Sequence, residues 1–236
     1  MARRIIIQNR GRGGPSYTSP SHRFFGKLAY PAVREQTYGE VMDIVNSVGH
    51  SSPLMILELE NGEMSLIPAI LGVKVGQRIT LGSKKAENGS IMRLKDIPTG
   101  SIVCNIESRP GDRGKFLRAC GTSAQVVTKD AKKIIVKMPS KQKKEFNPNC
   151  LATIGVVAGS GRGARPLLKA GNAHHKRKAR NKLFPIVKGV AMNVCDHPLG
   201  ATHRRGIGRP TAISRSTPPG AKFGSIAARR MGRKKR

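Results

Sequence analysis

The run Leu54-Met55-Ile56-Leu57-Glu58-Leu59, the pair Asn61-Gly62 and the run Glu63-Met64-Ser65-Leu66-Ile67-Pro68 decide the fold of this 236-residue chain. Both runs are short, and the first is apolar and rich in residues that suit β-strands. An Asn-Gly pair between two such runs is the strongest short signal for a hairpin. The sequence therefore predicts two antiparallel strands that turn at Asn61-Gly62.

Further short strands are expected on both sides of this hairpin. An alternating run extends over residues 39–45, and two more runs occupy residues 77–82 and 90–94. Short strands at this spacing are typical of a small closed barrel. We therefore expect an oligonucleotide-binding barrel over residues 35–97.

A second group of runs predicts a second small β domain. Its strands are expected over residues 102–107, 124–127, 133–138 and 150–157. Four or five short strands in this interval suit an SH3-like barrel over residues 98–168. Helical periodicity is scarce, and a short basic helix near residues 173–182 is an open alternative to irregular chain. The predicted class is all-β: two barrels between irregular basic extensions, residues 1–34 and 169–236.

Positive charge dominates both extensions. The whole chain has 44 Lys and Arg against 13 Asp and Glu, a formal net charge of +31. Residues 1–34 hold seven basic residues and no acid, and residues 169–236 hold eighteen basic residues and one acid, Asp196. Such a field attracts phosphate backbones, and chains this charged do not fold on themselves. We expect extensions that order on a polyanion, and their frequent Gly and Pro favour folded RNA over a uniform duplex.

Several other classes of protein are disfavoured. No run reaches the roughly 20 apolar residues of a membrane span, and the apolar run near the N-terminus is too short for a signal sequence. The four cysteines lack a Cys-x-x-Cys pair, which indicates reduced thiols in a cytoplasmic protein. The glycines of residues 159–163 lack the Gly-Lys-Ser/Thr ending of a phosphate loop. We expect no cofactor.

A metal site is also disfavoured. Four histidines and a cysteine gather in the last third of the chain, but without the paired spacing of zinc ligands. These residues are His174, His175, His197, His203 and Cys195.

The candidate RNA-binding side chains lie in the two extensions and just after the second barrel. The basic ones are Arg10, Arg12, Arg23, Arg162, Arg165, Lys176, Arg177, Lys178, Arg180, Arg204, Arg205, Arg209, Arg215, Arg229 and Arg230. Aromatic residues follow the first arginines, at Tyr17, His22, Phe24 and Phe25. These rings either stack on unpaired bases or dock on the neighbouring domain.

The stretch Met192-Asn193-Val194-Cys195-Asp196-His197-Pro198-Leu199-Gly200 is the most structured-looking part of the second extension. A carboxylate beside an imidazole suggests proton transfer, but an irregular basic extension cannot hold groups to catalytic tolerance. We expect no catalytic residue. Asp196 is expected to cap a turn over residues 197–200. Asn193 and His197 are further candidates for RNA contact, and the role expected of His197 is a supporting one rather than a catalytic one.

Several stretches together resemble the large ribosomal subunit protein L-two family. Residues 189–200, which contain Asn193-Val194-Cys195-Asp196-His197-Pro198, closely resemble its signature. Residues 121–125 and 149–157 are similar to its second barrel and to the strand before its extension. Residues 8–13 and 218–230 resemble the archaeal and eukaryotic branch. The similarity covers essentially the whole chain.

The resemblance implies a fold and a function. It implies an oligonucleotide-binding barrel, an SH3-like barrel and extensions that thread into large-subunit ribosomal RNA. It further implies a primary RNA binder that supports subunit association, tRNA binding and the peptidyl transferase centre, where RNA is the catalyst. The implied partners are ribosomal RNA, neighbouring ribosomal proteins and the small subunit at a bridge, with no membrane. His197 falls on a family histidine once proposed to assist peptide-bond formation, with Asn193, Asp196 and Pro198 on its companions.

The chain departs from the family pattern at three positions in this signature. Val194 stands where the family has Pro or Ala, Cys195 where it has Val, and Ala201 where it has a second Gly. These differences predict a turn that keeps its Asp-His-Pro core on a slightly altered backbone.

Three functions remain as alternatives once the residues and the resemblance are taken together. The leading one is a structural RNA-binding component of the large ribosomal subunit. A free-standing nucleic-acid chaperone or DNA-compacting protein is the second, although such a protein does not need two ordered barrels. An enzyme that uses Asp196 and His197 is the third.

Overall fold

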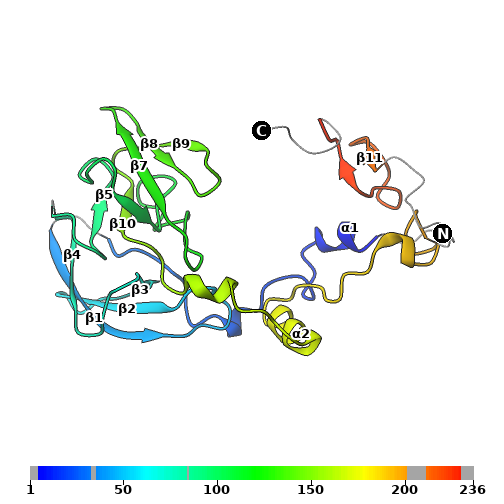
Figure 1. Ribbon diagram of the computed structural model, residues 1–236, viewed down its shortest axis with the longest axis horizontal. Helices are drawn as coiled ribbons and strands as arrows, with labels where there is room; N and C mark the ends of the chain where they lie inside the picture. The colour runs from blue at the N-terminus through cyan, green and yellow to red at the C-terminus, as the bar shows by residue number, and fades with distance from the viewer. Residues whose placement is uncertain (1–4, 33–35, 84, 201–210, 230–236) are drawn as a thin grey trace. The chain divides into compact units, whose positions relative to one another are not determined.

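Most regular structure in the protein is β-strand, as the computed structural model shows for residues 5–32, 36–83, 85–200 and 211–229 (Figure 1). The chain divides into two compact units. The globular unit is Ser21–Leu167, and the terminal unit combines Met1–Pro20 with Leu168–Arg236. Because strands make up most of the regular structure, the predicted all-β class is confirmed.

The hairpin predicted at Asn61-Gly62 forms between strands β2 (Leu54–Leu59) and β3 (Met64–Pro68). Its loop has three residues, because the Leu59 N–H donates to the carbonyl of Glu63 (3.0 Å) and the Gly62 N–H to the carbonyl of Leu59 (2.9 Å). Gly62 adopts φ 78°, a left-handed conformation that favours glycine. The Asn-Gly pair thus marks the correct turn in a longer loop than the two-residue form.

Ten strands of the globular unit form one sheet in the order β3-β2-β1-β4-β5-β10-β6-β7-β8-β9. The eight besides the hairpin strands are β1 (Thr37–Val45), β4 (Arg78–Leu81), β5 (Ile91–Arg93), β6 (Ile102–Cys104), β7 (Ala124–Lys129), β8 (Ile134–Lys137), β9 (Lys143–Phe146) and β10 (Leu151–Ile154). Neighbours in the sheet are antiparallel except β4 and β5, which meet in parallel at one residue pair.

Three strands differ from the prediction. The strand predicted over residues 150–157 is β10, which ends at Ile154, because Gly155 takes φ 117°. The strand predicted over residues 102–107 ends at Cys104, because Asn105 takes φ 48° and leaves the extended region. Strand β9 was not expected, since Lys143, Lys144 and Glu145 are exposed and only Phe146 is buried. A strand at the end of a sheet with one buried residue carries no apolar alternation.

Two groups of buried side chains form the core of the globular unit. One lies mainly on β1 to β5 and includes Val41, Leu57, Ile79 and Leu81. The other lies mainly on β6 to β10 and includes Val103, Val126, Val136 and Ala152. Strand β10 pairs with both β5 and β6, so it joins the two halves of the sheet. The division into an oligonucleotide-binding barrel at 35–97 and an SH3-like barrel at 98–168 stays a prediction.

The terminal unit contains short elements linked by turns. These are α1 (Ile6–Arg10), α2 (Ala170–Lys178), the 3-10 helix η3 (Gly189–Ala191), and the parallel pair β11 (Ala212–Ile213) and β12 (Ser225–Ile226). The open alternative of a basic helix near residues 173–182 is realised as α2, which begins and ends a few residues earlier. Neither α1 nor the β11–β12 pair was expected, because these elements are too short to show a period.

Candidate nucleic-acid interface

The signature stretch folds as two successive turns of backbone. The N–H groups of Asp196 and His197 both donate to the carbonyl of Asn193 (3.1 Å each). The N–H of Gly200 then donates to the carbonyl of His197 (2.9 Å), which confirms the turn expected over residues 197–200. A Cβ at Gly200 would collide with the Asn193 carbonyl, so the second turn requires glycine there.

The ring of His197 is held by residues distant in sequence. Its centroid lies 5.7 Å from that of Phe223, which is itself buried. On another side the ring packs so closely on Gly189 that a Cβ at that glycine would overlap the imidazole. His197 is therefore positioned by η3 and by the segment before β12.

The hydrogen bonding of His197 defines what its ring can do. Nδ1 accepts a hydrogen bond from the N–H of Leu199 (3.1 Å). A ring nitrogen that accepts carries no proton, so the neutral imidazole carries its N–H at Nε2. Partial burial lowers the pKa of His197, which favours this neutral form. A carboxylate cannot receive a proton from Nδ1 here, so the catalytic Asp-His geometry considered above is absent at that nitrogen.

The positions that depart from the family pattern lie at the surface. Val194 and Cys195 are exposed, so neither side chain supports the turn by packing. Ala201 lies outside the described residues. The structure gives no reason for valine or cysteine at these two positions.

The first extension is tied to the second within the terminal unit. The Nδ2 of Asn181 donates to the carbonyls of Pro15 (3.1 Å) and Thr18 (2.6 Å). The Thr18 hydroxyl donates to the carbonyls of Gly13 and Gly14, which closes the glycine turn behind Arg10 and Arg12. Both arginines are exposed, so their guanidinium groups face solvent on a loop fixed by its backbone.

Helix α2 carries basic side chains on a surface with no buried residue. Lys176 and Lys178 are exposed, whereas Arg177 is half-buried. Its Nη1 donates to the carbonyl of Leu183 (3.4 Å), and its guanidinium lies 5.4 Å from the ring centre of Phe184. Arg177 therefore fixes the chain beyond the helix and presents less of its charge than its neighbours do.

The remaining basic candidates are placed as follows. Arg162, Arg165, Arg215 and Arg229 are exposed, and Arg23 and Arg180 are half-buried. Arg162 belongs to the 3-10 helix η2 (Ser160–Gly163), which follows Gly159 in a left-handed conformation (φ 82°). Arg204, Arg205, Arg209, Arg230 and His203 lie outside the described residues.

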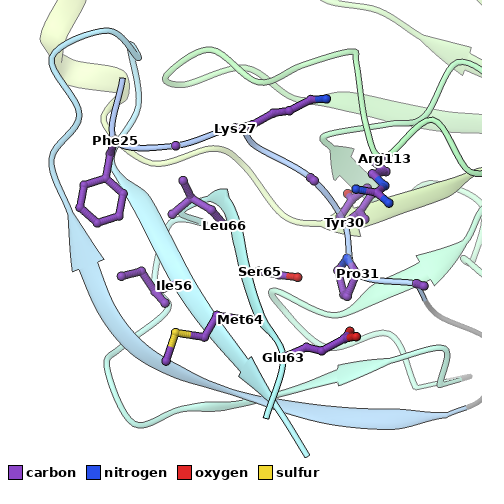
Figure 2. Close-up of a pocket in the computed structure, with 13 residues that line it drawn as sticks. Phe25, Lys27, Tyr30, Pro31, Ile56, Glu63, Met64, Ser65, Leu66 and Arg113 are labelled. Atoms are coloured by element: carbon purple, nitrogen blue, oxygen red, sulfur yellow. The ribbon is translucent and has the colours of Figure 1, made fainter. Parts of the chain in front are cut away.

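The aromatic residues Phe24 and Phe25 differ in their packing, and stacking on bases stays a prediction. Phe24 packs within the globular unit, with its ring edge-on to His50 (4.9 Å) and directly over Gly49. Phe25 is 59 % exposed and lines a surface hollow of about 710 Å³. In Figure 2, Phe25, Ile56, Met64 and Leu66 gather on one side of this hollow, while Lys27 and Arg113 lie toward the other. The carboxylate of Glu63 also lines the hollow. An apolar surface beside cations can hold a base and its phosphate, and Glu63 lowers the net positive charge available for this.

A second hollow, of about 730 Å³, lies beside the signature stretch in the terminal unit. It is lined by Ile6 and Asn9 of α1 and by the chain from Val187 to Asp196. Asn193 is exposed at its border, so this candidate and the first helix share one concave surface.

The described ranges contain neither a cluster of metal ligands nor a helix that could span a membrane. No group of three His, Cys, Asp or Glu residues there could hold a metal ion. No helix among the described residues is long and apolar enough to cross a membrane.

Sequence reasoning missed three residues that build the interface. Gly189 and Phe223 enclose His197, and Asn181 joins the two extensions. Asn181 adopts φ 46° just after α2, and an asparagine behind a short basic helix is a recognised signal for such a helix end. The contacts of Gly189 and Phe223 leave no trace in local spacing.

Comparisons with known proteins agree with the family resemblance of the motifs. The family described as "Ribosomal Proteins L2, C-terminal domain" matches residues 87–220. The "Large ribosomal subunit protein uL2" of Methanococcoides burtonii is 46 % identical over 99 % of this chain and 100 % of its own length. The proteins of that name from Methanosphaera stadtmanae and Haloarcula marismortui are each 47 % identical, over 100 % and 99 % of this chain and 100 % and 98 % of their own lengths. The chain therefore belongs to the family of large ribosomal subunit protein uL2.

Proposed function

We propose that this chain is a structural constituent of the large ribosomal subunit that binds ribosomal RNA, chiefly through its two extensions. It takes part in translation as a component of the cytoplasmic ribosome and not as an enzyme. Its partners are large-subunit ribosomal RNA and neighbouring ribosomal proteins.

The observation that carries this proposal is the charge of residues 169–236 together with its exposure. This segment contains eighteen basic residues and a single acidic residue, Asp196. Lys176, Lys178, Arg215 and Arg229 lie at the surface. One carboxylate cannot neutralise this segment, and a phosphate backbone supplies the missing charge at the required density.

The signature turn has a positional role in this proposal. Its fixed backbone and the packed His197 ring present an Nε2–H, a donor that suits a phosphate, ribose or base oxygen of RNA. Asn193 and His197 contact RNA from this turn. We further propose that the protein supports subunit association, tRNA binding and the peptidyl transferase centre, and that it meets the small subunit at a bridge.

The test is sedimentation of cell extract through a high-salt sucrose gradient, with detection of this chain in each fraction. Stoichiometric migration with the large subunit after the salt wash is expected, because contacts to many phosphates within folded RNA are cooperative. Recovery at the top of the gradient, or migration with DNA, contradicts the proposal and favours the chaperone or DNA-compacting function.

A second experiment tests the signature turn. Ribosomes that carry His197→Ala are expected to assemble more slowly, or to work at a modestly reduced rate, and still form peptide bonds. Complete loss of peptide-bond formation in normally assembled subunits contradicts a purely supporting role.

A further inference from the structure

Two hairpins of the globular unit share one turn geometry but differ at its key position. In the β2–β3 hairpin the left-handed residue is Gly62 (φ 78°). In the β8–β9 hairpin the Met138 N–H donates to the carbonyl of Gln142 (2.9 Å) and the Lys141 N–H to that of Met138 (2.8 Å), the same pattern. The left-handed residue there is Lys141, with φ 66°. A hairpin with lysine at this position is less stable than one with glycine, because the lysine Cβ crowds the backbone.

A second feature of this hairpin also opposes its stability. Lys137 on β8 and Lys143 on β9 are direct partners in the register, and both are exposed. Side chains of directly opposed residues lie on the same face, and like charges at such positions repel. With Lys141 in the loop between them, three exposed lysines lie at the tip of the hairpin that β8 and β9 form (strands labelled in Figure 1).

The acids of the hairpin do not offset this charge. Glu145 pairs with a different lysine, because its carboxylate accepts a hydrogen bond from Nζ of Lys133 (2.9 Å). Asp130 lies in the turn before β8, at the end of that strand opposite to Lys137. Neither acid therefore neutralises the positive charge of the lysines at the tip of the hairpin.

Protection of a sheet edge against aggregation explains only part of this pattern. Strand β9 is an edge, and lysines there prevent pairing with another chain. Lys137, however, lies on β8, which is paired on both sides, and Lys141 lies in the loop. The opposite edge, β3, carries Met64, Ser65 and Leu66 and no lysine.

We propose that Lys137, Lys141 and Lys143 form a phosphate-binding surface at the tip of the β8–β9 hairpin, and that it docks on the backbone of an RNA. The inference rests on the proposed RNA-binding function and adds to it a contact surface in the globular unit. Three lysines without an arginine fork or an aromatic ring bind phosphate as point charges and do not read bases.

The experiment measures binding of the full-length chain to a large-subunit ribosomal RNA transcript over a series of salt concentrations. The hairpin variant combines Lys137→Gln, Lys141→Gly and Lys143→Gln. A matched control removes three exposed lysines of the same unit, as Lys74→Gln, Lys95→Gln and Lys132→Gln. Lys141→Gly alone is a further variant, which is expected to raise the thermal midpoint because it relieves the left-handed lysine.

The hairpin variant is expected to lower the slope of log affinity against log salt by about 2 to 3, and to weaken binding about 10- to 100-fold near physiological salt. The control triple is expected to change this slope by less than about 0.7, which is less than the loss of one phosphate contact would cause. Equal slopes for the two triples overturn the proposal while RNA binding stands. Aggregation of the hairpin variant at unchanged RNA affinity also overturns it and assigns the lysines to edge protection. Absence of salt-dependent binding by the wild-type chain contradicts the proposed function itself.

Discussion

At the scale of single residues, Glu107 shows how one buried acid shapes a basic loop. Its side chain is 1 % exposed, and its carboxylate accepts hydrogen bonds from the N–H groups of Gly111 (3.3 Å), Arg113 (2.9 Å) and Leu151 (2.9 Å). These bonds fasten the loop before Arg113 to the start of β10. A carboxylate suits this place because it accepts at both oxygens and donates at neither.

Replacing Glu107 with Gln is expected to lower the free energy of unfolding by about 2 to 3 kcal/mol. The new amide group points a donor at backbone donors, so at least one buried N–H loses its partner. Urea unfolding followed by circular dichroism measures the change. Glu60→Gln, at an exposed turn position, is the matched control and should be close to neutral. Equal midpoints for the two variants would contradict the anchoring role.

His197 predicts a pH dependence of the signature turn. Burial lowers its pKa, so the folded chain holds a proton there less firmly than the unfolded chain, whose histidine titrates near about 6.5. The turn is therefore expected to be fully stable above that pH and to lose stability as pH falls through it toward the lower folded pKa. Protonation of Nδ1 would also break the bond from the Leu199 N–H.

Nuclear magnetic resonance measures this shift directly. The Cε1–H signal of His197 is expected to titrate at lower pH in the native chain than in urea. Phe223→Ala, which opens one side of the ring, should move the native titration toward the denatured one. Identical titrations in native and denatured chain would rule out burial as the cause.

At the scale of elements, the β2–β3 and β8–β9 hairpins show which turns the local sequence can predict. The Asn61-Gly62 turn was predicted because its residues suit its backbone. Gly62→Ala is expected to cost about 1 kcal/mol, since alanine at φ 78° is crowded by its own Cβ. Thermal unfolding measures the loss, and Gly14→Ala, at a glycine without positive φ and with no atom within 4 Å of an added Cβ, is the control. A neutral Gly62→Ala would show that the loop rearranges.

Much of the sheet could be predicted from the sequence. Strands β4, β7 and β8 bury alternate residues, whereas β2 is a short run that is almost wholly apolar. Strand β9 was not predicted, because Phe146 is its only buried residue. Lys144 on the same strand lies with its ammonium 3.7 Å from the ring centre of Phe116, a contact that the sequence pattern does not show. The β11–β12 pair was not predicted because two-residue strands are defined by a distant partner. Pairing between residues 212 and 225 has no local signature.

The candidate interface was predictable to a similar degree. Charge and motif identified the extensions and the turn at His197, because both are properties of consecutive residues. Asn181 and Phe223 act across the chain, and Lys137 and Lys143 become partners only through the register of two strands. Each of these contacts depends on the fold, so spacing alone cannot reveal it.

At the scale of the whole molecule, the four thiols differ in exposure, and Cys120 of the globular unit is half-buried. Cys104 and Cys150 are buried in the globular unit, and desolvation raises the pKa of their thiols to about 12 and about 11. Cys195 in the terminal unit is exposed. Because Cys195 is accessible to reagents, it is expected to react with an alkylating reagent at neutral pH. The two buried thiols are inaccessible and their raised pKa keeps them protonated, so they react only after unfolding.

The same reagent tests the proposed interface in assembled subunits. Cys195 lies within the signature stretch, so packing of that stretch against RNA should slow its alkylation relative to the free chain. Mass spectrometry of alkylated peptides gives the rates, and Cys195→Ser identifies the signal. Equal rates in free chain and large subunit would place the stretch away from RNA.

Strand β10 sets an order of events during synthesis of the chain. It lies between β5 and β6 in the sheet, yet it is the last of the ten strands to be made. Until residues 151–154 leave the translating ribosome, the two halves of the sheet have no strand to join them, and both expose edges. A nascent chain halted before this point would therefore be the species most in need of a chaperone. Once β10 is in place, the globular unit closes while most of the basic C-terminal extension is still unmade, which keeps that polycation out of the folding reaction.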